Sequence, residues 1–199
     1  MKKQKKRRRN PAFSSFGMRL IYRGLYFFFH CRVEKREVPA EGDEAVVYIA
    51  NHYTVFGPIG FVLSVPDLNH VWINRELMDP ELSAATMRPG LVQLLPFAGK
   101  RLIDRLSAFL GNLSCKIMVL FGAIGVDRSK PASLITTMRE SVEALAKGEN
   151  LLIFPETGIP EYSLTSVTPF FSAFATLGHL YHRKTGKSLR FCPVYVDEQ

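Results

Sequence analysis

The sequence predicts an α/β fold with a mixed or mainly parallel central sheet flanked by helices. Three observations indicate this fold. Short apolar runs typical of buried strands recur along the chain, stretches with helical spacing of apolar residues lie between them, and polar motifs follow the strands directly. With 199 residues and 47% hydrophobic side chains, the chain is long and apolar enough for one domain and a tail.

The individual elements follow from apolar runs and from their boundary residues. The expected strands cover residues 45–50, 71–73, 123–126, 151–154 and 189–196. The expected helices cover residues 59–65, 134–145 and 169–183. Pro58 suits the first turn of the first helix and Pro66 would stop it, while Gly148 and Gly186 would end the other two.

Residues 80–121 give no clear pattern of strand or helix. Four residues break this stretch, namely Pro89, Gly90, Pro96 and Gly99. Two apolar clusters, residues 91–97 and 106–121, lie on either side of Arg101 and Arg105. We expect residues 91–121 to be either a surface that contacts acyl chains or membrane, or ordinary core.

The positive charge of the chain is confined to its N-terminus. Residues 1–36 hold 12 Lys and Arg and one acid, a net charge of +11, whereas residues 37–199 have a net charge of −3. This split disfavours a body that binds nucleic acid and favours a basic tail directed at an anionic surface. The three cysteines form no zinc spacing, so we expect no metal and a reduced, cytoplasmic setting.

The basic run is followed by an amphipathic stretch. Apolar residues between Phe16 and Phe29 would share one side of a helix, with Arg19 and Arg23 one turn apart on another. We expect residues 1–36 to form a basic tail and a helix in the membrane interface, and residues 37–199 to form the α/β domain. A helix packed on the core behind a solvated tail is the open alternative.

Four polar motifs follow or lie within the expected strands. They are Asn51-His52, Asp127-Arg128, the segment Phe154-Pro155-Glu156-Thr157-Gly158, and Pro193-Val194. Polar groups at successive strand ends of an open α/β sheet can converge on one ligand site. The chain has no G-x-S-x-G and no G-x-G-x-x-G, which disfavours a serine hydrolase and a dinucleotide-binding protein.

The order of these motifs resembles that of the glycerol-3-phosphate and lysophosphatidate acyltransferases. Their pattern N-H, G-x-I-x-V-D-R, F-P-E and a closing P-V matches Asn51-His52, residues 122–128, residues 154–156 and Pro193-Val194. The resemblance spans residues 45–196. It implies a glycerolipid acyltransferase-like fold and transfer of a fatty acyl group from a thioester donor to the hydroxyl of a lysophospholipid or glycerol phosphate.

The resemblance also implies roles for the site residues. His52 would be the general base, Arg128 would hold the acceptor phosphate, the backbone of Thr157 and Gly158 would receive the oxyanion, and Glu156 would place the acceptor or brace the loop. Acyl-CoA or acyl-carrier protein would be the donor substrate, with no further cofactor. The expected location is the cytoplasmic face of the cell membrane, held peripherally by its anionic surface.

The chain departs from the family pattern in two places. Gly57 stands where the family has the Asp that orients the base, and Thr157-Gly158-Ile159 stands where the family has G-T-R. A catalytically silent lipid-binding relative is therefore the alternative function. A third hypothesis, an RNA-associated protein, is supported only by the basic tail. A structural role also stays open for each of the three residues. His52 could be a structural histidine, Arg128 could form a surface ion pair with Asp127, and Glu156 could accept a hydrogen bond from the start of a helix.

Overall fold

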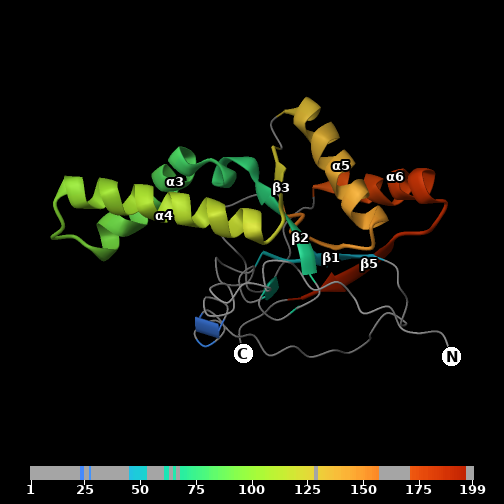
Figure 1. Cartoon of the computed structure of the whole chain (residues 1–199), viewed down its shortest axis with the longest axis horizontal. Coiled ribbons are helices and arrows are strands. Elements are labelled where there is room, and N and C mark those ends of the chain that lie inside the picture. Colours follow the sequence, from blue (N-terminus) through green and yellow to red (C-terminus); the bar gives the residue numbers. More distant parts are fainter. Residues whose placement is uncertain are drawn as a thin grey trace. The chain divides into compact units, whose positions relative to one another are not determined.

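A parallel five-stranded sheet flanked by helices forms the framework of the chain, an α/β fold (Figure 1). The structure is a computed structural model, and it describes residues 23–24, 27, 45–52, 61–62, 65, 68–127, 130–156 and 171–195. Arg23, Gly24 and Phe27 are helical, and the rest of the expected interfacial segment lies outside the described residues.

The strands agree with the apolar runs of the sequence. They are β1 (Val46–Ala50), β2 (Leu68–Asn74), β3 (Ala123–Val126), β4 (Asn150–Ile153) and β5 (Arg190–Val194). Their order in the sheet is β3-β2-β4-β1-β5. The pairs β1/β4, β1/β5 and β2/β4 are parallel. Pro193 lies in β5 at the edge of the sheet, where a residue without an N–H disturbs the fewest ladder hydrogen bonds.

The helices of the described chain differ from the prediction mainly in residues 80–121. They are α3 (Pro80–Leu94), α4 (Lys100–Leu120), α5 (Pro131–Ala146) and α6 (Thr176–Thr185), with short 3-10 turns η2 (Arg75–Met78) and η3 (Ser172–Ala175). Gly148 and Gly186 follow α5 and α6 with φ of 81° and 71°, the left-handed conformation that ends a helix. The expected breaks at Pro96 and Gly99 form the loop between α3 and α4.

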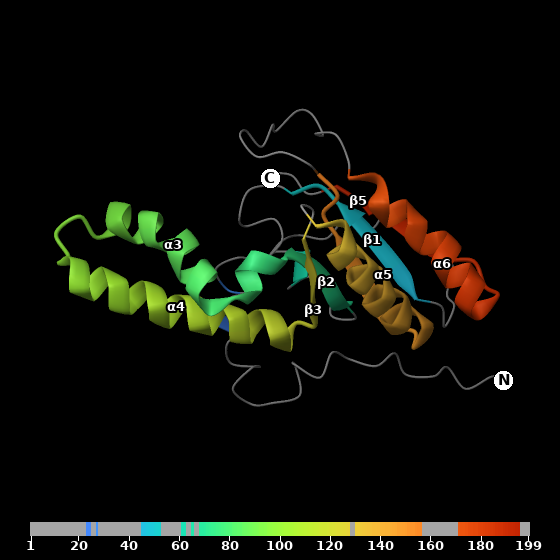
Figure 2. The same ribbon diagram turned by 90° about the horizontal axis from the view of Figure 1, so that it is seen from above.

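The expected break at Pro89 and Gly90 is wrong, because both residues lie inside α3. Asp79 starts this helix, since its carboxylate accepts hydrogen bonds from the backbone N–H groups of Glu81 and Leu82 at 2.9 and 3.0 Å. α3 lies beside α4 in both views (Figures 1 and 2). Side-by-side packing of two helices offsets the weak helical preference of Pro and Gly, which the sequence pattern alone does not reveal.

The described chain divides into two compact units. The first comprises Met1–Val71 and Met138–Gln199, and the second comprises Trp72–Thr137. The boundary passes within β2 and within α5. The first unit contains β1, β4, β5 and α6, and the second contains η2, α3, α4 and β3.

The core of the first unit is made of strand residues and of one face of each covering helix. Leu151, Leu152 and Ile153 of β4 are almost completely buried, as are Leu145 of α5 and Leu177 of α6. Figure 2 shows α5 and α6 along β1. Burial of large apolar side chains from both strands and helices is the main stabilisation of such a layered fold.

A buried pair of asparagines aligns the three central strands at their amino ends. The backbone N–H of Val46 donates to Oδ1 of Asn150, and the backbone N–H of Asn150 donates to Oδ1 of Asn69, each at 2.9 Å. Both side chains are buried. These bonds join β1 to β4 and β4 to β2. They fix the register of the three strands, and this register determines which residues lie side by side at the carboxyl ends of the strands.

Candidate functional site

Two of the polar motifs meet because β1 and β4 are neighbours in register. Their Cα partners are Val47 with Leu151, Tyr48 with Leu152, and Ile49 with Ile153. The same offset of 104 residues continues past the strand ends, where the backbone N–H of His52 donates to Oε2 of Glu156 at 2.8 Å. The structure therefore places the backbone of His52, the expected base, in contact with the side chain of Glu156 from the F-P-E motif.

The imidazole of His52 lies against an aromatic ring. Its ring and that of Phe154 meet edge to face, with centroids 5.2 Å apart and planes at 69°. His52 as a residue is half-buried and its Nδ1 atom is buried. Phe154 is itself buried at the end of β4, so it is a fixed surface that restricts the orientation of the imidazole.

The role of Phe154 was not predicted from the sequence. The signal was present, because Phe154 opens the F-P-E motif and follows an apolar strand directly. The sequence placed Phe154 at the end of a strand and in the F-P-E motif, and it predicted no contact between Phe154 and His52. Glu156 was expected to bind the acceptor or brace a loop, and its contact with the backbone of His52 agrees with bracing.

The closing P-V motif lies on the other side of β1. Pro193 pairs with Ile49 and Val194 with Ala50, so this motif is beside the last residues of β1. Cys192 precedes it and pairs with Tyr48. Burial raises the pKa of the Cys192 thiol, which is the opposite of the shift that activates a cysteine nucleophile.

The other predicted site residues lie outside the described residues. These are Arg128, Thr157 and Gly158, together with Gly57, where the family has its carboxylate. Asp127 is described within the second unit, where Lys130 Nζ lies 3.8 Å from its Oδ2 and its backbone oxygen accepts a hydrogen bond from Ser133 Oγ. The described site therefore consists of His52, Phe154 and Glu156 in the first unit.

Among the described residues, no helix combines the length and the apolar character that crossing a bilayer requires. Within the same ranges, no group of three or more His, Cys, Asp and Glu side chains is arranged to hold a metal ion.

Comparison with known proteins adds no relative to this description. No family model matches the chain, and no curated protein and no solved structure is significantly similar to it.

Proposed function

We propose that this chain is an acyltransferase that moves a fatty acyl group from a thioester donor to the hydroxyl of a lysophospholipid or a glycerol phosphate. The proposal rests on the order of the four motifs and on one structural observation. The backbone N–H of His52 donates to Glu156 Oε2 at 2.8 Å, which links two motifs that are 104 residues apart in the sequence.

This contact supports a catalytic use of His52 because it holds the loop that carries the base. A carboxylate that accepts a backbone N–H makes a charge-assisted hydrogen bond, which is stronger than a neutral one. Phe154 restricts the ring from a second direction. A general base acts only when it is held within hydrogen-bond reach of its proton, and two fixed neighbours reduce the freedom of His52 to turn away.

In the proposed step, His52 accepts the proton of the acceptor hydroxyl while the hydroxyl oxygen attacks the thioester carbonyl carbon. The C–O bond forms, the C–S bond breaks, and the leaving thiolate takes the proton back from the imidazolium. Because Nδ1 of His52 is buried, we assign proton transfer to Nε2. Glu156 acts through His52 and is a positioning residue.

The remaining roles come from the resemblance alone. Arg128 would bind the acceptor phosphate through its guanidinium, and the backbone N–H groups of Thr157 and Gly158 would stabilise the oxyanion. Acyl-CoA or acyl-carrier protein would supply the acyl group, and the enzyme would work peripherally at the cytoplasmic face of the membrane.

Release of free thiol from acyl-CoA in the presence of lysophosphatidate tests the reaction. We expect His52→Ala to lower the rate about 10²- to 10⁴-fold, the usual contribution of a general base. His179→Ala is the matched control, because His179 is an exposed residue of α6, and it should keep the rate of the wild type. Equal rates for wild type and His52→Ala, with unchanged circular dichroism, would contradict the proposal.

A catalytically silent lipid-binding protein is the second candidate. The observation that favours it is Gly57, which stands where the family has the carboxylate that orients the base. Such a protein would bind lysophosphatidate with an affinity that His52→Ala leaves unchanged, and it would release no thiol from any acyl donor. The thiol assay and a binding titration on the same samples separate the two functions.

A further inference from the structure

The hairpin formed by α3 and α4 buries small side chains and exposes large apolar ones. Along α4, the buried residues recur every four positions, and three of the four are small: Ile103, Ser107, Gly111 and Cys115. A Cβ atom at Gly111 would lie 2.6 Å from the backbone oxygen of Pro80, so the two helices touch backbone to backbone there. The small face of α4 is therefore the face that α3 covers.

The opposite face of α4 carries an apolar stripe. Leu102 and Phe109 are seven residues apart and Leu113 follows four residues later, a spacing that places all three on one side of a helix. Leu102 is 56% exposed and Phe109 is 62% exposed. A helix that faces water on one side normally exposes polar residues and buries its large apolar residues, whereas α4 buries mainly small residues and exposes these three large ones beside its polar residues.

The loop end of the hairpin continues this apolar surface. The segment from Leu94 to Ala98 has no polar side chain, and Phe97 in it is 100% exposed. A backbone hydrogen bond from Ala98 N–H to Leu95 oxygen closes the turn at 3.0 Å. Moving a loop out of water costs less free energy when its backbone donors are already hydrogen-bonded within the loop.

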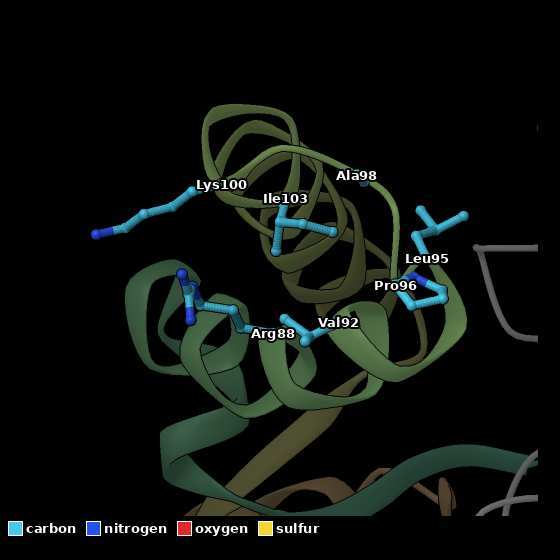
Figure 3. Close-up of a pocket in the computed structure, with 7 residues that line it drawn as sticks. All are labelled: Arg88, Val92, Leu95, Pro96, Ala98, Lys100 and Ile103. Atoms are coloured by element: carbon cyan, nitrogen blue, oxygen red, sulfur yellow. The ribbon is translucent and has the colours of Figure 1, made fainter.

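Basic side chains border the apolar surface. Residues 80–120 contain five Lys and Arg and only two acids, and one of these acids, Asp104, pairs with Arg88 at 2.9 Å. Figure 3 shows Arg88 and Lys100 at the loop end of the hairpin, around the pocket that Val92 and the inward-facing Ile103 line. Further along α4, Arg105 is three residues after Leu102 and Lys116 three after Leu113, so both are neighbours of the stripe.

We propose that the surface formed by Leu94, Phe97, Leu102, Phe109 and Leu113 docks the hairpin on the surface of an anionic lipid bilayer. The apolar side chains would enter the boundary between headgroups and acyl chains, and the surrounding Lys and Arg would contact lipid phosphates. Docking does not depend on the acyl-transfer reaction, and it assigns membrane contact to a part of the chain other than the basic tail.

The charge of the hairpin argues for lipid over a second copy of the chain. Two identical hairpins facing each other would bring two sets of five basic residues together against two acids each, and like charges facing one another oppose association. An anionic bilayer supplies both an apolar interior and the opposite charge.

Sedimentation of the full chain with vesicles tests the proposal, using vesicles of phosphatidylcholine and phosphatidylglycerol in equal amounts. We expect Phe97→Ser to weaken binding about tenfold, and Leu102→Ser/Phe109→Ser/Leu113→Ser about a hundredfold, from the loss of apolar burial. Ile135→Ser is the matched control, because Ile135 is 73% exposed on α5 outside the hairpin, and it should bind as the wild type does.

A second measurement reports insertion directly. Tryptophan fluorescence of the Phe97→Trp variant should be quenched by brominated lipids in these vesicles, beyond the quenching of the wild type. Three results would overturn the proposal: wild-type affinity in both serine variants, an unquenched Phe97→Trp variant, or a wild-type dimer in solution that the triple substitution dissociates. Failure of the thiol assay leaves these results unchanged, so the two proposals are tested separately.

Discussion

The two units of the chain differ in how completely they bury their large apolar residues. In the first unit, Leu151, Leu152 and Leu177 are almost completely buried. In the described part of the second unit, the residues buried to the same degree are Ser83 and Thr137, both small and polar. Most of the large apolar side chains that are exposed in the described chain belong to the hairpin, including Phe97, which is fully exposed.

This difference matches the two roles proposed above, chemistry for the first unit and membrane contact for the hairpin. The first unit has a core of its own, and that core fixes the strand ends where His52 and Glu156 meet. The hairpin keeps its two helices together mainly through small residues and leaves large apolar side chains such as Phe97 and Phe109 exposed. Stability in water thus comes mainly from the first unit, because stabilisation follows the apolar area removed from water.

The largest expected difference is in stability, between the substitution of one leucine in the first unit and of one leucine in the second. Leu152→Ala should lower the free energy of unfolding by about 2–5 kcal/mol, because it leaves a cavity in a closely packed core. Leu102→Ala should change it by less than about 0.5 kcal/mol, because Leu102 is an exposed residue of α4. Urea titration of both variants measures the difference, and equal losses would refute the contrast between the units.

A smaller effect is expected where α3 and α4 approach each other. Gly111→Ala should destabilise the hairpin by about 1–3 kcal/mol, because the added Cβ would lie under 3 Å from the backbone of Pro80 and Ala84. Gly90→Ala in α3 is the matched control, because a Cβ there has open space. It should be neutral or stabilise by up to about 1 kcal/mol. Thermal unfolding followed by circular dichroism compares the two variants.

The mildest prediction concerns Glu156 in the first unit. Glu156→Gln keeps a side-chain oxygen for the His52 N–H and should retain most of kcat. Glu156→Leu removes the acceptor and should lower kcat about tenfold or more, in line with the roughly 1.5–3 kcal/mol of a hydrogen bond to a charged group. Thiol-release kinetics measure both variants. If Glu156→Gln lowered kcat as much as Glu156→Leu, the negative charge of Glu156 would be needed for the reaction itself, and Glu156 would not be a positioning residue.

The fold was predictable from sequence where local pattern and tertiary packing agree. The apolar run at residues 151–154 overlaps β4 (Asn150–Ile153), whose four residues are all buried, as is typical of a strand inside a parallel sheet covered on both faces. α3 was not predictable, because Pro89 and Gly90 argue against a helix and the contact with α4 overrides them. The signal for that contact was the run of small residues at Ser107, Gly111 and Cys115, spaced four apart.

The site was predictable in outline and not in its contacts. Polar residues after adjacent parallel strands must lie at one edge of the sheet, so the nearness of His52 and Glu156 follows from the fold. The sequence did not predict that β1 and β4 are neighbours, which depends on the complete strand order. Nor does a motif reveal that Glu156 accepts from the backbone of His52 while Phe154 restricts its ring.

The central claim is that the first unit transfers acyl groups with His52 as the base. Its most direct test is detection of the acylated lipid by mass spectrometry after incubation of the full chain with acyl-CoA and lysophosphatidate. We expect phosphatidate from wild type and from His179→Ala, and at least about a hundredfold less from His52→Ala. Phosphatidate from His52→Ala at the rate of the wild type, or none from folded wild type with any acyl donor, would contradict the account.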